Sequence, residues 1–269
     1  MSAIIIGVIV MPSSLRFLYF GYQCPHNTYL LARIKTLAWK ESVPLHIDDV
    51  TGDPGKCEEY RIFSPTTLIV NDSLRWLGPF SREEVLAMLY DEELPPRERG
   101  ALADEPVVEG ELAPITPESV LSTCAPCLMS DDVGLCRGKA EWTQTILGET
   151  GADHLGYLHF EDGTCVGGAE YLPSTRIPYP IPDKRNTNAF LTCSFRSDAE
   201  KDYMSFPLRK LVDELGASGY DTLSAVCSTN TAFPNGPADW FERMGFERRE
   251  TLAHEELHDT DLVFMQLRL

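Results

Sequence analysis

The sequence predicts an α/β protein with two domains joined by a linker. The chain has 269 residues, which the usual size of a domain divides into two units. Apolar runs of strand character alternate with segments whose apolar residues recur at helical spacing. Residues 91–113 hold eight acidic side chains, two basic ones and three prolines, a composition typical of an extended connector. We therefore expect domains at residues 1–93 and 114–269, with a linker at 94–113.

The charge of the chain argues against a nucleic-acid or membrane partner. The formal net charge is −18 and the isoelectric point about 4.7, so the surface repels nucleic-acid backbones and anionic lipids. Hydrophobic residues make up 43% of the chain, which is enough for a core in each domain. We expect a small-molecule partner, and the composition leaves the oligomeric state open.

The cysteines and the N-terminal residues favour a cytoplasmic location. Eight cysteines are scattered along the chain, which is not the density of a disulfide-stapled secreted domain. The apolar run at residues 3–11 is too short to span a bilayer and lacks a basic flank. We interpret this run as an additional buried strand or an ordered lead-in.

The first domain is expected to have the element order βαβαββα. Asn71 and Asp72 favour a tight hairpin turn, and Ser81 with Glu84 matches a capping box. The expected strands cover residues 15–22, 44–50, 66–70 and 73–78, and the expected helices follow residue 27 and cover 57–62 and 82–90.

This order, with the turn Cys24-Pro25-His26-Asn27 after the first strand and Pro65 opening the third, resembles the thioredoxin-like fold. The resemblance implies that Pro65 is cis and faces Cys24, and that the helix start lowers the pKa of Cys24. The redox motif of that fold needs a second thiol, but Asn27 stands in its place. Two interpretations remain open: a monothiol that forms adducts or senses oxidants, and a docking module that shapes a substrate site.

The second domain is expected to begin with helices and to continue as a sheet. Asp162-Gly163 joins two strands, and a proline-rich excursion leads into the strand of residues 188–196. Four apolar residues at helical spacing follow, in a helix that Ser205 can cap and Gly216 can end. A strand, a short helix closing on Gly245-Phe246 and final strands complete the chain.

The series of strand, loop, helix, strand and a helix closing on Gly-Phe resembles the core of the GNAT N-acetyltransferases. The resemblance implies a GNAT acyl-CoA N-acyltransferase fold at 114–269 that transfers an acetyl group from acetyl-CoA to a small amine. A narrower resemblance, to bacterial and archaeal GNAT-like proteins of unassigned substrate, is carried by Cys124, Cys127, Cys136, Lys139, Trp142, Gly167, Glu170, Tyr171, Pro173 and Cys193.

Acyl transfer to an amine needs a base for the amine, a polarised carbonyl and an acid for the leaving thiolate. The resemblance places Glu170 and Tyr171 on the strand before the cofactor strand, and we assign both to the catalytic site, with Glu170 as the base. Strand alternation directs one of these side chains into the cleft and the other into the opposite layer. His159 is a second candidate base.

The usual position of the acid lies four residues before Gly245, where this chain has Phe241. Phenylalanine cannot donate a proton, so Tyr203, Tyr157 or water would have to protonate the leaving thiolate. A non-catalytic protein that uses both folds for binding or thiol sensing therefore stays open as an alternative.

The cofactor loop departs from the family pattern. Glycines normally let backbone N–H groups approach the pyrophosphate, but residues 196–207 contain none and carry three acidic side chains. Pro207 also removes one N–H group from the helix start. We predict weak or absent acetyl-CoA binding. The resemblance assigns the cofactor site to Cys193, Ser194, Phe195, Arg196, Lys201, Ser205, Phe206 and Leu208.

The cysteines of the second domain do not support a metal site. Cys124, Cys127 and Cys136 offer three ligands, whereas a structural zinc site needs four. His154 is the nearest further candidate, and its spacing fits no standard zinc pattern. We assign no metal and interpret these cysteines as a redox pair or as buried thiols.

Overall fold

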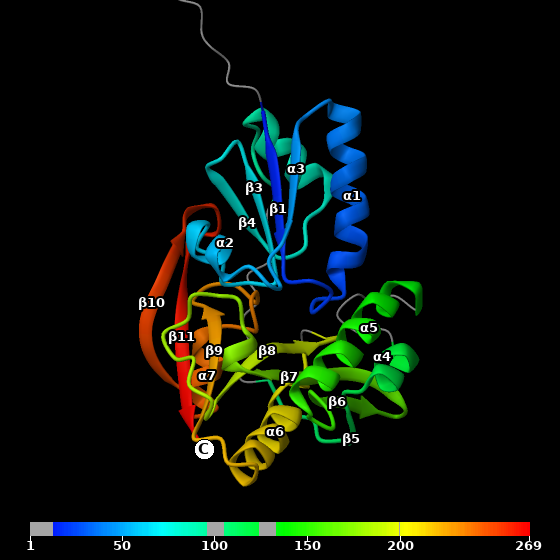
Figure 1. Ribbon diagram of the computed structural model, residues 1–269, viewed down its shortest axis with the longest axis vertical. Coiled ribbons are helices and arrows are strands. Elements are labelled where there is room, and N and C mark those ends of the chain that lie inside the picture. Colours follow the sequence, from blue (N-terminus) through cyan, green and yellow to red (C-terminus); the bar gives the residue numbers. More distant parts are fainter. Residues whose placement is uncertain (1–12, 96–104, 124–132, 199) are drawn as a thin grey trace, which may run out of the picture.

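The computed structural model describes residues 13–95, 105–123, 133–198 and 200–269. It contains two β-sheets, a small one in the first part of the chain and a large one in the second (Figure 1). The expected strand at residues 3–11 and the pair Cys124 and Cys127 lie outside the described residues.

The first part has a four-stranded sheet in the order β2-β1-β3-β4. Strands β1 and β2 run parallel, whereas β3 is antiparallel to both β1 and β4. The observed element order is the predicted βαβαββα. The elements are β1 (Leu15–Tyr19), α1 (His26–Glu41), β2 (Leu45–Asp49), α2 (Pro54–Glu59), β3 (Thr66–Val70), β4 (Leu74–Leu77) and α3 (Arg82–Tyr90).

Local signals in the sequence determine several of these boundaries. Asn71 and Asp72 both have positive φ angles, 53° and 56°, and close the expected hairpin between β3 and β4. The capping box of Ser81 and Glu84 at the start of α3 is confirmed. Helix α2 begins earlier than expected because the Asp53 side chain accepts a hydrogen bond from the Lys56 N–H group at 3.0 Å and caps it.

The second part has a seven-stranded sheet in the order β10-β11-β9-β8-β7-β6-β5. Its neighbours are antiparallel except β8 and β9, which run parallel. The elements are β5 (Glu111–Pro114), α4 (Pro117–Thr123), α5 (Val133–Thr150), β6 (Gly156–Glu161), β7 (Thr164–Pro173), η2 (Ser174–Arg176), β8 (Asn188–Arg196), α6 (Ser205–Ala217), β9 (Thr222–Ser228), α7 (Ala238–Arg243), β10 (Glu247–Glu255), η3 (Glu256–His258) and β11 (Thr260–Arg268).

The end of the expected linker belongs to the large sheet. Residues 111–114 form the edge strand β5, which pairs antiparallel with β6. Further upstream, Val107 forms a β-bridge with Asp202. Sheet pairing uses backbone groups, so an edge strand tolerates the charged side chains that suggested a linker. The described residues 105–114 therefore lie against the second domain instead of extending away from it.

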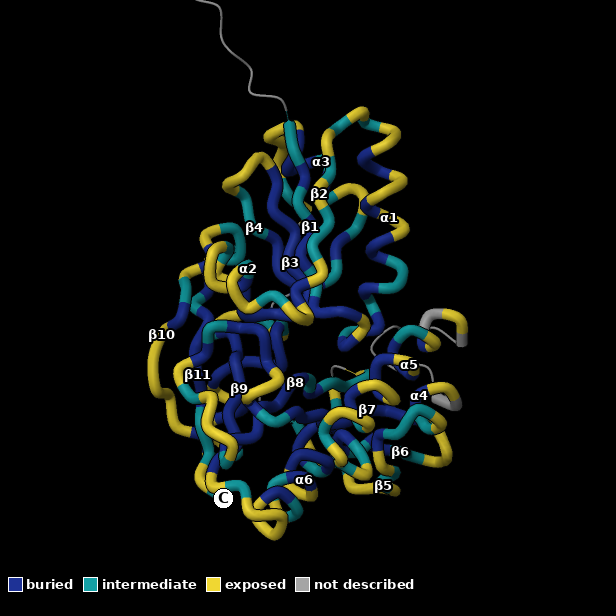
Figure 2. Tube along the Cα trace, in the orientation of Figure 1, coloured by how far each residue is buried: buried dark blue, intermediate teal, exposed yellow. Residues whose placement is uncertain are grey.

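The two parts of the chain share a core. One face of the large sheet is covered by α6 and α7, and the other by α4, α5 and the end of the small sheet (Figure 1). Phe20, just after β1, packs edge-on against Trp142 of α5 and against Tyr179, with ring centroids 6.0 and 5.8 Å apart. Figure 2 shows buried segments where β1 and β3 approach the large sheet. The first domain is thus docked on the sheet through an apolar interface.

Strands β8 and β9 diverge soon after they begin to pair. Their parallel register covers only residues 188–190 of β8 against 222–224 of β9. On its other side β8 continues to pair with β7, with an irregularity at Thr192. Glycines on β7 let neighbouring groups approach closely, since a Cβ atom on Gly168 would lie 2.7 Å from the Phe195 ring. The divergence leaves one edge of β8 open toward the first domain.

Candidate functional site

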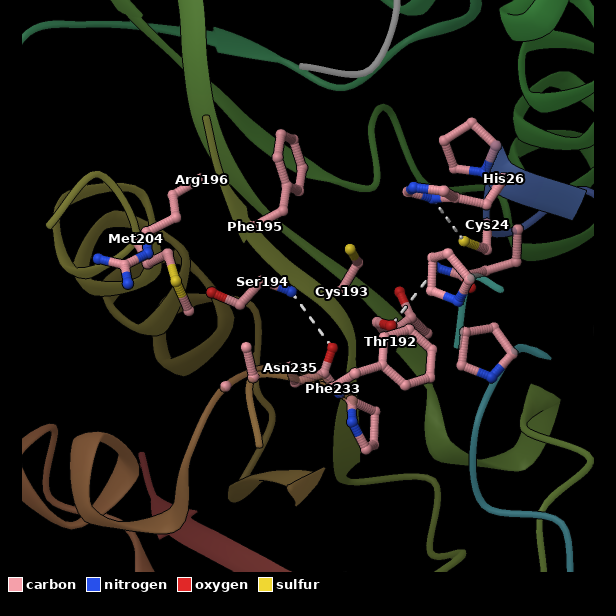
Figure 3. A pocket seen from close by; sticks show the side chains of 17 residues that line it. Cys24, His26, Thr192, Cys193, Ser194, Phe195, Arg196, Met204, Phe233 and Asn235 are labelled. Atoms are coloured by element: carbon pink, nitrogen blue, oxygen red, sulfur yellow. Dashed lines mark hydrogen bonds between the residues drawn. The ribbon is translucent and has the colours of Figure 1, made fainter. Parts of the chain in front are cut away.

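A cavity of about 300 Å³ lies at the divergence of β8 and β9, where the first domain meets the large sheet. Its lining is mostly apolar. One wall comes from the start of α1 and from the loops around Pro65 and Pro79, and the other comes from β8, Met204 and the loop after β9 (Figure 3). The lining residues are Gln23, Cys24, Pro25, His26, Pro65, Pro79, Thr192, Cys193, Ser194, Phe195, Arg196, Met204, Ala232, Phe233, Pro234, Asn235 and Gly236.

The Asn235 side chain lies between β8 and β9 at the point where the two strands diverge. Its side-chain amide donates to the carbonyl of Leu191 on β8 at 3.3 Å and to that of Val226 on β9 at 3.2 Å. Its Oδ1 atom accepts from the Ser194 N–H group at 3.3 Å (Figure 3). The amide therefore satisfies backbone groups of both strands that their divergence leaves unpaired.

Cys24 lies at the start of α1, as the sequence predicts, and its free thiol lines the cavity. Its Sγ atom is 3.5 Å from Nδ1 of His26, in the same turn (Figure 3). The two side chains come from the N-terminal wall of the cavity and form a thiol–imidazole pair.

The expected lowering of the Cys24 pKa is wrong. Burial raises the pKa of the thiol to about 11, and this effect exceeds the opposing hydrogen bond from the His26 backbone and the charge of Lys139. Burial also lowers the pKa of His26 to about 4. At neutral pH the pair therefore consists of a protonated thiol and a neutral imidazole.

The turn around Cys24 differs from the expected redox geometry. Asn27 is fully buried; it donates to the carbonyls of Gly21 and Pro65 at 2.8 and 3.2 Å and accepts from the Thr66 hydroxyl at 2.7 Å. Asn27 stands where the redox motif has its resolving cysteine, and its side-chain amide connects the turn to Pro65 and Thr66 by hydrogen bonds. Pro65 lines the cavity with Cys24, but the prediction that it is cis is wrong: within the described ranges, only the bond before Pro234 is cis.

Cys193 on β8 contributes the second thiol of the cavity (Figure 3). Its pKa is raised, first by burial and then by the nearby charges of Glu170 and Cys24. The effect of Cys24 on the pKa of Cys193 is consistent with the position of both thiols in the lining of one cavity. Cys193 is therefore protonated at neutral pH, like Cys24.

Glu170 lies one layer behind the cavity wall and is almost completely buried. Its carboxylate forms an ion pair with Lys139 of α5 and accepts hydrogen bonds from Gln23 at 2.8 Å and from the Thr192 hydroxyl at 2.7 Å. Gln23 and Thr192 themselves line the cavity. Lys139 also stacks on the Trp142 ring at 4.2 Å. Glu170 thus ties both walls of the cavity together through its partners, and it is not itself a lining residue.

The two other expected catalytic residues lie away from the cavity. Tyr171 points into the opposite layer beneath α6, and burial raises its pKa to about 12. His159 is fully buried, has Nδ1 3.1 Å from the Tyr203 carbonyl oxygen and packs on Phe206. The alternation expected for residues 170 and 171 is present, but neither Tyr171 nor His159 reaches the site.

The phenols suggested as proton donors are also engaged elsewhere. Tyr203 donates to Glu161 at 2.5 Å, and Tyr157 donates to Glu214. Burial, together with the bond to Glu214, raises the pKa of Tyr157 to about 12. Neither phenol lines the cavity.

The start of α6 is closed by a carboxylate of the chain itself. Asp202 is 6% exposed, and its Oδ1 atom accepts from the N–H groups of Met204 and Ser205 at 3.0 and 2.9 Å. Asp202, and not Ser205 as predicted, therefore caps this helix. The Ser205 hydroxyl donates to Asp202 at 2.5 Å and accepts from the Trp240 indole at 3.1 Å.

The cations near this helix start are paired as well. Arg196 forms an ion pair with Glu105 and donates to the Lys201 carbonyl at 3.2 Å, and Lys201 pairs with Glu161 at 3.1 Å. Of the expected cofactor residues, Cys193, Ser194, Phe195 and Arg196 line the cavity, whereas Lys201, Ser205, Phe206 and Leu208 do not.

Two buried polar atoms beside the cavity have no hydrogen-bond partner in the described part of the chain. They are Oε1 of Gln23, in a residue that is 2% exposed, and Oγ of Ser194, in a residue that is 8% exposed. Both residues line the cavity. Unpaired buried polar groups are costly, so their position indicates a ligand with both a donor and an acceptor.

Sequence reasoning missed His26, Gln23, Asp202 and Asn235. The Cys-x-His spacing at residues 24–26 was visible as a possible nucleophile and base. An aspartate three residues before a helical segment was a visible capping signal for Asp202. The roles of Gln23 and Asn235 depend on distant segments and had no local signal.

Comparisons with known proteins give a likeness of fold. No family model and no curated protein matches the sequence. The similar solved structures include an acetyltransferase of the GNAT family from Desulfovibrio desulfuricans, a ribosomal-protein-alanine N-acetyltransferase from Brucella melitensis and an N-acetyltransferase from Staphylococcus aureus. They are 16, 18 and 15% identical, each with a TM-score of 0.43. The matches cover 59, 59 and 60% of this chain and 98, 99 and 99% of theirs.

The described residues offer neither a metal site nor a membrane-spanning helix. No group of three or more histidine, cysteine, aspartate or glutamate side chains there is arranged to hold a metal ion. None of the helices in the same residues combines the length and apolar character that a bilayer crossing requires.

Proposed function

We propose that the protein is an N-acyltransferase that transfers an acetyl group from a small thioester to a small amine in the cavity between β8 and the first domain. The observation that carries this proposal is the divergence of β8 and β9 into an apolar cavity, because such a cavity excludes water from a reacting thioester. The amine acceptor and the GNAT mechanism are what the sequence resemblance implies.

The diphosphate of acetyl-CoA does not fit the residues present. The N–H groups at the start of α6 that would hold it are taken by Asp202. Arg196 and Lys201, the nearby cations, are paired with Glu105 and Glu161. A second negative group at this position would meet a buried carboxylate. We therefore propose a donor recognised through its acyl and thiol ends, and derive no step through acetyl-CoA itself.

We propose that the first domain is a thioredoxin-like module that shapes the substrate site. Its strand order and the position of Cys24 at the start of α1 support this assignment. The trans Pro65 and the structural Asn27 oppose a dithiol redox role. Residues 23–26, Pro65 and Pro79 of this domain form the wall of the cavity that faces β8.

A second candidate function is a non-catalytic protein that senses thiol-reactive compounds. The side chains of Asn235 and Asp202 favour this sensor function. Both form hydrogen bonds to backbone groups that would bind the thioester cofactor in the resembled family. In this case Cys24 would be modified, but no amine would be acylated.

Calorimetry with two donors tests the first proposal. S-acetylpantetheine lacks the diphosphate and nucleotide of acetyl-CoA, so we expect the two Kd values to agree within about tenfold. A normal set of charge-assisted N–H bonds, at about 1.5–3 kcal/mol each, would separate them by orders of magnitude. Turnover is followed by mass spectrometry of a panel of small amines. Failure to bind either donor, with no acetylated amine, would contradict the proposal and favour the sensor.

The variant Asp202→Asn sharpens this test. An asparagine oxygen can still cap α6, but the buried negative charge is gone, so affinity for acetyl-CoA should rise by about tenfold, which is about 1.4 kcal/mol. Affinity for S-acetylpantetheine should not change. Asp198→Asn is the matched control, because it removes the same charge from an exposed position four residues upstream.

A further inference from the structure

The side chains of Cys24 and His26 lie in contact in the cavity, but the proposed acyl transfer assigns no role to them. Direct transfer to an amine needs no thiol from the protein. The Sγ–Nδ1 distance of 3.5 Å is within the range of a hydrogen bond to sulfur. A thiol and a base in hydrogen-bond contact are the general signature of an activated nucleophile.

The pKa values, about 11 for the Cys24 thiol and about 4 for His26, oppose a separate thiolate–imidazolium pair, so the proton can move to nitrogen only as the bond from sulfur to carbon forms. With the thiol protonated and the imidazole neutral, the S–H group can donate to Nδ1 in the tautomer that carries the ring proton on Nε2. From neighbouring elements, the Lys139 ammonium and the Thr66 hydroxyl also favour the thiolate, whereas Glu170 opposes it. A thiol that is protonated at neutral pH needs such a base before it can attack a carbonyl.

The cavity next to this pair is prepared for a polar ligand. The unpaired Oε1 of Gln23 directly precedes Cys24 and accepts a hydrogen bond, as an amine or amide N–H would donate. The unpaired hydroxyl of Ser194 directly follows Cys193 on the opposite wall and can donate to a carbonyl. These two atoms point to a ligand that carries both groups, independently of the thiol itself.

We propose that Cys24 is a catalytic nucleophile that accepts the acyl group from the thioester donor and passes it to the amine. This inference rests on the proposed acyl transfer. Sγ of Cys24 attacks the thioester carbonyl carbon while its proton moves to Nδ1 of His26. The donor C–S bond breaks, and the same proton goes to the leaving thiolate.

The second half of the reaction restores the free enzyme. The amine nitrogen attacks the Cys24 thioester, an N–C bond forms and the Sγ–C bond breaks. One proton of the amine returns to sulfur through His26. Exchange of one thioester for another is nearly balanced in free energy, and neither half consumes an oxidant or reductant. Cys193 is not assigned this role, because no imidazole contacts its thiol in the described part of the chain.

Intact-mass and peptide-mapping spectrometry after incubation with S-acetylpantetheine alone tests the assignment. We expect one acetyl group per chain, located on Cys24. Cys24→Ala should lose both this label and amine acetylation, while the matched variant Cys165→Ala, which changes a free thiol outside the cavity lining, keeps both. His26→Gln should slow labelling by roughly 10²-fold with little change in donor Kd, since a general base acts on the rate.

The outcomes separate this inference from the acyltransferase proposal. Unlabelled Cys24 together with normal amine acetylation by Cys24→Ala would overturn the covalent route and leave direct transfer standing. Labelling of Cys193 in place of Cys24 would overturn it as well. If Cys24→Ala does not fold, Cys24→Ser keeps nearly the same size, and turnover at the wild-type rate in that variant would equally overturn the route. No donor binding by the wild-type protein would remove the acyltransferase proposal itself.

Discussion

Two helix starts border the site, and the chain uses them in opposite ways. The start of α1 has no side-chain cap and carries Cys24 into the cavity. The start of α6, which the resembled family would use for a diphosphate, is closed by Asp202. At α1 the backbone N–H group of His26 bonds the Cys24 thiol, whereas at α6 the N–H groups of Met204 and Ser205 bond Asp202 and are not open to an anion. The chain therefore presents a thiol at one helix start and closes the other with its own carboxylate.

The largest expected effect concerns the reactivity of Cys24. Because its pKa is raised to about 11, its rate of alkylation by iodoacetamide should rise about tenfold per pH unit from neutral pH upward. An ordinary cysteine, with a pKa near 9.0, levels off earlier. Peptide mapping in a Cys193→Ala background gives the rate for Cys24 alone. A plateau below pH 8 would show that the helix start activates the thiol and would erase the contrast with α6.

The second expected effect compares the ion pairs at the two ends of the site. Lys139→Met leaves Glu170 buried without a cation and should lower the free energy of unfolding by about 3–5 kcal/mol. Lys201→Met, at the α6 end, removes a partly exposed, solvent-screened pair and should change the free energy of unfolding far less. Urea unfolding measures both.

The double variant Lys139→Met with Glu170→Gln is the control for this prediction. Removing the buried charge together with its partner should recover most of the lost stability. Equal losses in the two single variants would contradict the view that the thiol end is held by a buried network.

The smallest expected effect concerns the turn that carries Cys24. Asn27→Ala removes hydrogen bonds to Gly21, Pro65 and Thr66 and should cost about 1–3 kcal/mol. Thr36→Ala, on an exposed face of the same helix, is the matched control. Asn27→Cys should lose similar stability. A stabilising disulfide with Cys24 in that variant would show that the redox geometry is intact after all.

Much of the local structure could be read from the sequence. The hairpin at Asn71 and Asp72 and the capping box at Ser81 depend on residues a few positions apart, so the local sequence favours them. The position of Cys24 at a helix start and the strand that carries Cys193 follow from the same kind of signal. Hydrophobic periodicity and turn residues thus determined the order of elements in both halves.

The chemistry of the site was decided by the tertiary structure. Gln23 meets Glu170 across 147 positions of sequence, and Arg196 meets Glu105 across 91. Burial at the contact between the two parts sets the protonation of Cys24 and His26, and no local pattern encodes it. The alternation along β7 correctly separated Glu170 from Tyr171, but only the packing of α5 shows that Glu170 is paired with Lys139. The desolvation of a side chain and its contacts with distant residues depend on how the two parts of the chain pack together. The sequence therefore determined the helices and strands, whereas the tertiary structure determined the chemistry of the site.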